Sequence, residues 1–311
     1  MTGQVIPCII VDNHTICNRG AVSGIDAEIV LTSSDGEVGV LPALGGALSH
    51  WRVRGEDVLR PRIDASPDPT DSACFVLAPF SNFISDGILR FRNDRFALPP
   101  NHPKEPLFIH GDAWLGAWSV NRFAGNFAEI RYDHERIRGF PFRYSVSQRI
   151  RIDHARLAMS LVLRNADHRS MPAGLGVHPY FCKSRGVRLR APHAGLWLDG
   201  AVHRDARFLH DDPLGQVAID DCFMKWNRSA CLTLPELRRQ ITINASESAR
   251  ALVVYSPLRA NFICVEPVTH VNDGINCMAD GADATGVQVL EPGGSMQLDV
   301  EFRVDHLTDG A

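Results

Sequence analysis

The sequence predicts an all-β protein, an antiparallel sandwich or barrel, on three observations. Apolar and polar residues alternate with period two over residues 142–152, 157–163 and 296–304, as they do in half-buried strands. The 311 residues include 25 Gly and 19 Pro, which disfavour helices and mark turns. No window of helical length carries an apolar stripe at helical spacing. Closely spaced strands with turns between them are typical of sandwiches and barrels.

The first long element, 142–152, places Phe142, Tyr144, Val146, Gln148, Ile150 and Ile152 on one face, and with 157–163 it predicts a long hairpin. Residues 235–241 are expected to form one short turn of helix. The Pro-rich segment 61–71 suits a surface loop better than a linker, so one domain spanning residues 1–311 is expected. The remaining strands are expected at 27–31, 37–41, 47–53, 127–132, 187–190, 196–199, 251–255, 262–265 and 296–304.

Composition excludes several classes of function. The net charge is -4, and the only lysines are Lys104, Lys183 and Lys225, so no basic patch for nucleic acid is expected. No run of roughly 18 to 20 apolar residues and no signal-peptide layout is present, so we expect a cytoplasmic protein without a membrane partner. Eight cysteines without a CxxC pair support neither a zinc knuckle nor a disulfide framework.

Three segments place polar residues in apolar surroundings: 78–112, 174–182 and 262–276. Each has an ionisable side chain near the end of an apolar strand, namely His110, His178 and Glu266. Burial raises the pKa of a Glu and lowers that of a His, which suits both to acid-base catalysis near neutral pH. His270, four residues after Glu266, is either a solvated loop residue or a member of the site. The spacing contains no HxH or HExxH pattern that would favour a metal.

At these residues the chain resembles the aldose 1-epimerase family, the galactose mutarotases. The similarity follows the order of the family's motifs and extends from about Leu41 to Val304, and its most specific part is His178-Pro179-Tyr180-Phe181. The other matching motifs are Asn82 with Phe83, His110-Gly111, Asp220-Asp221-Cys222-Phe223, Glu266 with Asp273-Gly274-Ile275-Asn276, and Glu291-Pro292-Gly293-Gly294.

The resemblance implies a large antiparallel β-sandwich of the galactose mutarotase-like type with a sugar-binding cleft. It also implies cofactor-free interconversion of the α and β anomers of a monosaccharide. Glu266 is then the general base, His178 the general acid, and His110 a hydrogen-bonding partner near the ring oxygen. Asp220 and Asn82 would hold sugar hydroxyls. Tyr180, with Trp114 and Trp118, is expected either to form a wall for the apolar face of the sugar or to belong to the core.

Phe83 stands where the family has an arginine, and a phenyl ring cannot donate a hydrogen bond to a sugar. Arg90, Arg92 or Arg95 is a candidate to replace that guanidinium. Two alternatives stay open: a hexose-phosphate 1-epimerase, which would need clustered arginines at the mouth of the cleft, and a non-catalytic carbohydrate-binding protein on the same scaffold. The sequence leaves the sugar and the oligomeric state open.

Overall fold

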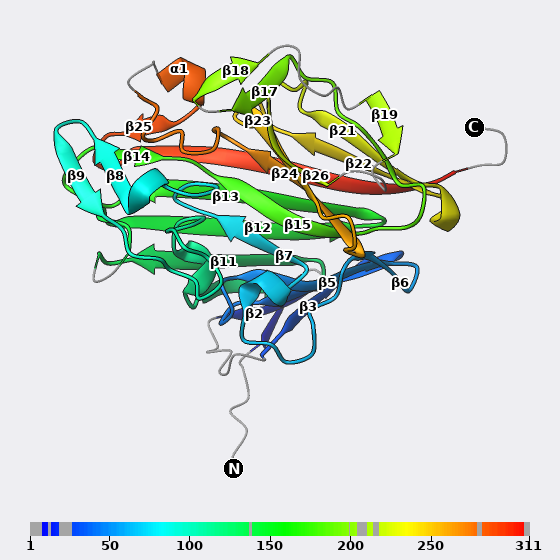
Figure 1. Cartoon of the computed structure of the whole chain (residues 1–311). Helices are drawn as coiled ribbons and strands as arrows, with labels where there is room; N and C mark the ends of the chain where they lie inside the picture. The colour runs from blue at the N-terminus through cyan, green and yellow to red at the C-terminus, as the bar shows by residue number, and fades with distance from the viewer. Residues whose placement is uncertain are drawn as a thin grey trace.

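The protein folds into two large antiparallel sheets that pack face to face (Figure 1). The computed structural model describes residues 8–11, 14–18, 27–136, 139–198, 200–203, 210–213, 218–278 and 282–307. Each large sheet has 11 strands, and every pairing within them is antiparallel. The expected antiparallel β-sandwich is therefore confirmed. Among the described residues no helix has the length and apolarity needed to cross a bilayer.

The first sheet is centred on the predicted hairpin. Strands β12 and β13 pair along their whole length, and β13 pairs with β26 on its other side, with Gln148 opposite Leu161 and Leu161 opposite Leu298. In order across the sheet the strands are β1 (Cys8–Val11), β2 (His14–Asn18), β10 (Ser119–Ala124), β11 (Phe127–His134), β12 (Tyr144–Asp153), β13 (Arg156–Asn165), β26 (Ser295–His306), β22 (Arg239–Ala245), β21 (Ser229–Leu234), β16 (Arg188–Arg190) and β19 (His210–Pro213).

The second sheet lies in front of these long strands in Figure 1. Its strands in order are β18 (Ala201–His203), β17 (Gly195–Leu198), β20 (Ile219–Met224), β23 (Ala251–Ser256), β24 (Phe262–Val268), β15 (Gly176–Cys182), β6 (Glu56–Leu59), β5 (Ala47–Val53), β4 (Gly36–Leu41) and β3 (Ile29–Thr32), and β7 (Cys74–Leu77) pairs with both β15 and β5.

The smaller elements connect and flank the sheets. They are the two-stranded pairs β14 (Met171–Ala173) with β25 (Gln288–Leu290) and β8 (Ile88–Phe91) with β9 (Asp94–Ala97), the short helix α1 (Ala282–Thr285), and 3₁₀ turns at Pro69–Asp71, Ser85–Gly87, Ala113–Leu115 and Pro235–Leu237.

The central strands of the second sheet, β7, β15 and β24, are buried on both faces, and this positions the polar groups. Along β15, Val177 and Phe181 point into the main core between the sheets, where Phe181 packs against Phe302 of β26 with ring centroids 5.4 Å apart. The alternate residues His178 and Tyr180 point to the opposite face, which carries a second apolar cluster. Strand alternation thus delivers ionisable side chains to a buried surface.

Some expected elements differ from the structure. In 235–241 only Pro235–Leu237 forms a 3₁₀ turn, because strand β22 begins at Arg239 and extends the first sheet. The strand expected at 196–199 is β17, which ends at Leu198, and Asp199 lies outside the described residues. The sequence interpretation missed several strands, which are short or alternate only weakly, among them β1, β2, β6, β8, β9, β10, β14, β18, β19, β20, β21, β22 and β25.

Candidate active site

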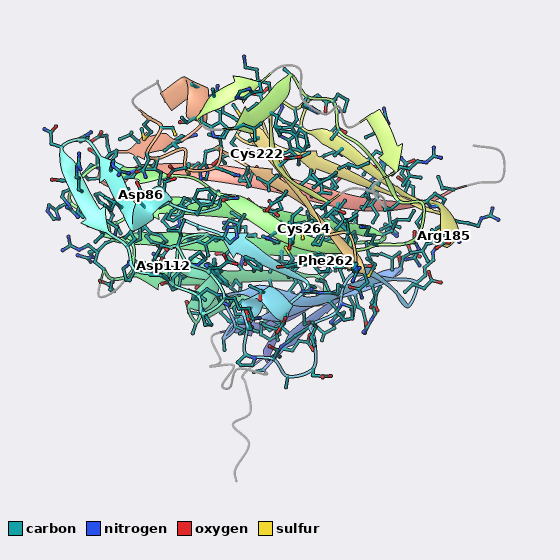
Figure 2. The ribbon with its side chains drawn as sticks, viewed as in Figure 1. Asp86, Asp112, Arg185, Cys222, Phe262 and Cys264 are labelled. Carbon is teal, nitrogen blue, oxygen red and sulfur yellow. The ribbon has the colours of Figure 1, made fainter. Side chains whose placement is uncertain are left out.

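A cavity of about 520 Å³ lies over the face of the second sheet that points away from the first. Its floor comes from β7, β15, β20, β23 and β24, and its walls come from residues 60–70 and 82–114. In Figure 2, Cys264 and Phe262 mark this region near the middle of the view, whereas Asp86 and Arg185 lie at opposite edges of the molecule. The cavity is lined by all six residues that the sequence predicts for the site: Asn82, His110, His178, Tyr180, Asp220 and Glu266.

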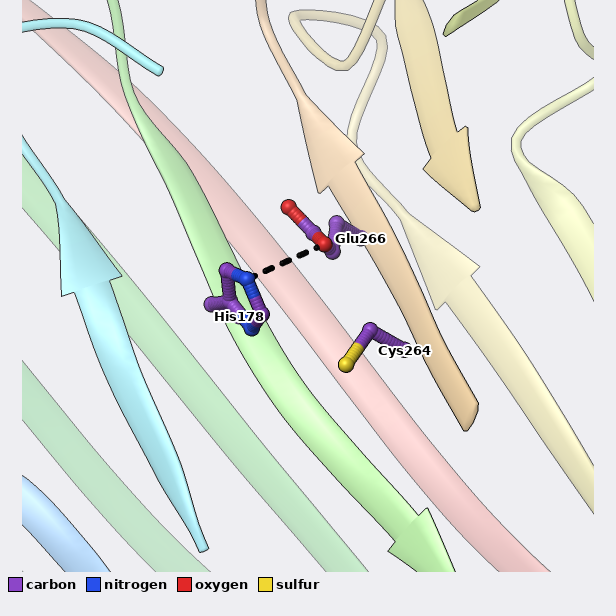
Figure 3. A group of neighbouring side chains, drawn as sticks. All are labelled: His178, Cys264 and Glu266. Carbon is purple, nitrogen blue, oxygen red and sulfur yellow. Dashed lines mark ion pairs between the residues drawn. The ribbon is translucent and has the colours of Figure 1, made fainter. Parts of the chain in front are cut away.

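His178 and Glu266 meet across two paired strands. Tyr180 of β15 lies opposite Cys264 of β24. Because the strands are antiparallel, His178, two residues before Tyr180, lies opposite Glu266, two residues after Cys264. Nε2 of His178 and Oε1 of Glu266 are 3.3 Å apart (Figure 3). The Glu266 side chain is 2% exposed, and that of His178 is 10% exposed. A carboxyl and an imidazole are therefore within reach of one proton in a nearly dry site.

Burial shifts both groups toward their uncharged forms. It raises the pKa of Glu266 well above its ordinary value, and the negative charge of Asp220 adds to that effect. Burial also lowers the pKa of His178 to about 3. Both shifts are in the direction of an uncharged pair, a protonated Glu266 beside a neutral His178. Moving one proton across the 3.3 Å gap converts it into a carboxylate and an imidazolium.

His110 is locked to Asn82 by two hydrogen bonds. The backbone N–H of Asn82 donates to Nδ1 of His110 (3.0 Å), and the backbone N–H of His110 donates to the Asn82 carbonyl (2.7 Å). Burial lowers the pKa of His110 well below its ordinary value, with a smaller contribution from the charge of His178. A neutral ring that accepts at Nδ1 carries its proton on Nε2, so His110 is a hydrogen-bond donor there.

The chain can place His110 there because Gly111 follows it. Gly111 has a φ of +68°, and a Cβ at this position would lie 2.1 Å from the carbonyl oxygen of Ala78. Only glycine combines that left-handed backbone with such a close approach. The His110 ring then lies nearly perpendicular to that of His178, with centroids 5.5 Å apart.

Aromatic rings fix the floor of the cavity. Phe75 of β7 stacks on His178 at 4.6 Å and on Trp114 at 5.2 Å, and His178 lies 4.8 Å from the Tyr180 ring. Trp114 is almost fully buried yet lines the cavity, whereas Trp118 packs in the main core. Of the three aromatic residues considered for a sugar-binding wall, Tyr180 and Trp114 line the cavity and Trp118 belongs to the core. Phe75 lines the cavity as well.

His270 is neither a solvated loop residue nor a residue of the cavity, but a buried side chain that holds a neighbouring loop. It is 1% exposed and is not a cavity-lining residue, and its Nε2 accepts a hydrogen bond from the backbone N–H of Ser81 at 3.0 Å. Burial lowers its pKa to about 4, so the ring is neutral and remains an acceptor. Asp273 likewise accepts from the backbone N–H of Ser85 at 3.1 Å. Both residues hold the segment that carries Asn82 and Phe83.

The expected replacement for the family arginine is wrong. Arg90 bonds to the Ile88 carbonyl and Asp86, Arg92 packs on Phe91, and none of Arg90, Arg92 and Arg95 lines the cavity. Those three residues lie on or beside the β8–β9 hairpin, which the sequence interpretation did not recognise as a separate element. The cavity-lining residues that sequence reasoning missed include Arg60, Thr70, His102, Lys104, Glu105 and Asn272.

Of these missed residues, Asn272 could have been found from its position in the sequence. It stands between Glu266 and the Asp273 motif, and its buried Oδ1 accepts no hydrogen bond among the described residues. The others lie on loops whose course no local pattern predicts.

The only group of the described residues that could hold a metal ion also involves Cys264. The ligand atoms of His178, Cys264 and Glu266 all lie within 4.8 Å of one another (Figure 3). Burial, together with the negative charge of Glu266, raises the pKa of the Cys264 thiol well above its ordinary value. Because a metal needs the thiolate, this environment disfavours binding.

Comparison with known proteins gives consistent results. The aldose 1-epimerase family model matches residues 28–303. The uncharacterized protein YphB of Escherichia coli strain K12 is 27% identical over 280 residues, covering 85% of this chain and 94% of that protein. A crystal structure of a candidate aldose 1-epimerase from Escherichia coli K12 superposes with a TM-score of 0.82 at 25% identity, covering 90% of this chain and 99% of the other.

A second solved structure, a galactose 1-epimerase from Lactobacillus acidophilus NCFM, shares the fold at 16% identity. It has a TM-score of 0.71 and covers 98% of both chains. The fold expected from the sequence, a sandwich of the galactose mutarotase-like type, is therefore confirmed.

Proposed function

Because this chain belongs to the aldose 1-epimerase family, we propose that it interconverts the α and β anomers of a free aldose by general acid-base opening and closing of the sugar ring. The observation that carries the proposal is the Glu266–His178 pair, 3.3 Å apart on the floor of a cavity that also presents His110. We also treat residues 1–311 as one domain, since the main core cluster draws on both sheets.

The reaction needs one proton removed and one supplied. The Glu266 carboxylate takes the proton of the anomeric hydroxyl as the bond from the anomeric carbon to the ring oxygen breaks. The electrons of that bond go to the ring oxygen, which receives a proton from the His178 imidazolium. The products are an open-chain aldehyde, a protonated Glu266 and a neutral His178.

Burial favours the uncharged pair, so forming the carboxylate and imidazolium costs free energy that is recovered when the ring opens and the two side chains become neutral again. Rotation about the bond next to the carbonyl exposes its other face. The same two side chains, with their roles reversed, then close the ring to the other anomer.

Other cavity residues would bind and orient the sugar. His110, with its proton on Nε2, donates a hydrogen bond near the ring oxygen, where negative charge develops. Asp220 and Asn82 bind hydroxyl groups. Tyr180 and Phe75 offer flat apolar surfaces to the C–H groups of the sugar. No step requires a cofactor in this scheme.

The charge of the cavity favours a neutral sugar over a hexose phosphate. Its lining contains two cations, Arg60 and Lys104, against the three carboxyl groups of Glu105, Asp220 and Glu266. Lys104 is itself paired with Asp68 at 2.9 Å. Phosphate recognition relies on clustered, available cations, and in this lining Arg60 has no second available cation beside it.

The test follows optical rotation or the anomeric proton signals of freshly dissolved α-glucose, α-galactose and other aldoses, with and without protein. We expect acceleration for at least one sugar, and a loss of about 10²- to 10⁴-fold in the Glu266→Gln variant. Folded protein that accelerates no aldose contradicts the proposal. Sugar binding that survives Glu266→Gln, with no turnover by the parent, would instead favour a carbohydrate-binding protein. Inhibition by inorganic phosphate would favour the hexose-phosphate alternative.

A further inference from the structure

Arg60 is a cavity-lining arginine whose guanidinium makes no ion pair among the described residues. It follows directly after strand β6, where its backbone N–H donates to the Tyr180 carbonyl at 2.7 Å. Its guanidinium carbon lies 4.1 Å from the centroid of the Tyr180 ring and 4.9 Å from that of Phe262. A cation placed over two rings of the cavity wall is thus held at the binding surface.

The position of this guanidinium is fixed by two backbone carbonyls. Nη2 donates to the carbonyls of Thr70 (2.8 Å) and Ser72 (2.9 Å), which tie it to the loop before β7. Nε is buried and has no hydrogen-bond partner in the described part of the chain. A guanidinium has five N–H donors; the two of Nη2 are used by these carbonyls and that of Nε is buried, so the two of Nη1 remain for a ligand. Holding it rigidly reduces the entropy lost when it binds one.

Phe83 cannot supply the hydrogen bonds that an arginine at its position would donate to a sugar. It lines the same cavity from a different wall, next to Asn82, and offers only a phenyl ring where the motif of the family has a guanidinium. The Tyr180 ring contacts both groups: its centroid is 4.1 Å from the Arg60 guanidinium carbon and 4.8 Å from the centroid of His178. A sugar with its anomeric carbon at His178 and Glu266 would direct hydroxyl groups of its far side toward Arg60.

We propose that Arg60 is a substrate-binding residue that hydrogen-bonds hydroxyl groups remote from the anomeric carbon and selects aldoses by their hydroxyl pattern there. The inference rests on the proposed function. Under this proposal Arg60, which follows strand β6 and is held by the loop before β7, donates the hydrogen bonds to the sugar that Phe83 cannot donate.

The experiment compares Arg60→Gln with Arg62→Gln. Arg62 is a matched control because its guanidinium also bonds a carbonyl of the same loop, that of Ser66 at 2.6 Å, but does not line the cavity. For Arg60→Gln we expect KM to rise about 10- to 100-fold, since a hydrogen bond from a charged donor is lost, while kcat changes little. Arg62→Gln should leave KM near that of the parent. Arg60→Lys retains the positive charge but loses the planar guanidinium with its paired N–H donors, and should give an intermediate KM.

Deoxy sugars identify the contacted hydroxyl. Removing the hydroxyl that Arg60 binds should raise KM for the parent but not further for Arg60→Gln, whereas the other deoxy sugars should penalise both proteins equally. Equal penalties for every deoxy sugar, or an unchanged KM in a folded Arg60→Gln variant, would overturn the assignment.

Sugar binding measured by calorimetry separates this inference from the proposed function. If the parent binds an aldose without epimerising it, the enzymatic proposal fails. Arg60 is then still judged by binding: a loss of affinity in Arg60→Gln but not in Arg62→Gln supports the inference, and unchanged affinity overturns it. Absence of binding to every aldose tested overturns both. Thermal unfolding of each variant excludes misfolding, and Arg60→Lys provides the readout if Arg60→Gln does not fold.

Discussion

Replacing Glu266 by Gln tests both the chemistry of the site and its effect on stability. The amide has nearly the size of the carboxyl group, so the contact with Nε2 of His178 at 3.3 Å can be retained. It can neither accept the proton of an anomeric hydroxyl nor ionise. We expect kcat to fall about 10²- to 10⁴-fold, while KM for the sugar changes much less, because only a group that acts in the transition state is lost.

The same substitution should stabilise the fold. Burial, and next the charge of Asp220, raise the pKa of Glu266 above its ordinary value of 4.5. The unfolded chain therefore ionises this carboxyl at lower pH than the folded chain, so the folded state is penalised increasingly as the pH rises from 4.5 to the folded pKa. Gln carries no such penalty. We expect the variant to gain about 0.5–2 kcal/mol in free energy of unfolding near neutral pH, and almost nothing near pH 4.

Urea unfolding of the parent and variant across this pH range measures the gain, and anomer interconversion measures kcat. The exposed Glu236, which pairs with Arg185 at 3.0 Å, provides the control Glu236→Gln, for which neither a loss of kcat nor a pH-dependent gain is expected. A Glu266→Gln protein that keeps more than about a tenth of kcat, or whose stability relative to the parent does not grow with pH, refutes Glu266 as a buried general base.

Three other changes test the surroundings of the site. The folded pKa of His270 is about 4 against 6.5 in the unfolded chain, so the unfolded chain binds the proton first as the pH falls; in urea unfolding, His270→Gln should make the stability lost between pH 6.5 and 4 smaller than in the parent by about 3 kcal/mol. Gly174→Ala places a Cβ 2.2 Å from Nδ1 of the buried His270 and should cost about 1–3 kcal/mol in the same assay, whereas Gly125→Ala, with open space around it, should not. Asp112→Ala removes a buried carboxylate that accepts from the backbone N–H of Phe140 at 3.0 Å, and a loss of less than about 1 kcal/mol would argue against a structural role for that carboxylate.

The parts of the fold that were predictable are those with a strong local signal. The β12–β13 hairpin and β26 show strict period two because one face is buried and the other wet, and each was found within a few residues. Strands such as β20 and β21 were missed, since they are short and the flanking sequence gives little contrast. The central strands of the second sheet are buried on both faces, which weakens the alternation that sequence analysis depends on.

The candidate site was predictable where its residues stand in apolar runs on strands or in motifs shared with the family, and not where they lie on loops without such a motif. His178 and Glu266 stand within apolar runs, and their encounter follows from the pairing of β15 with β24. The expectation that Arg90, Arg92 or Arg95 replaces the family arginine failed because position in the sequence was taken as a guide to position in space. Arg60 follows strand β6, far from Phe83 in the sequence. It is held at the cavity by contacts with the rings of Tyr180 and Phe262, which no local sequence pattern predicts.

The floor of the cavity and its rim are built with different tolerance to change. The pairing of β15 with β24 sets the positions of His178 and Glu266, so any change that shifts these strands relative to each other also disturbs the sheet. Thr70, Lys104 and Glu105 belong to connecting segments that can vary in length and sequence at little cost to either sheet. Under the proposed function, divergence of such a protein can therefore proceed at the rim alone, so that a relative binds a different sugar and retains the same proton chemistry.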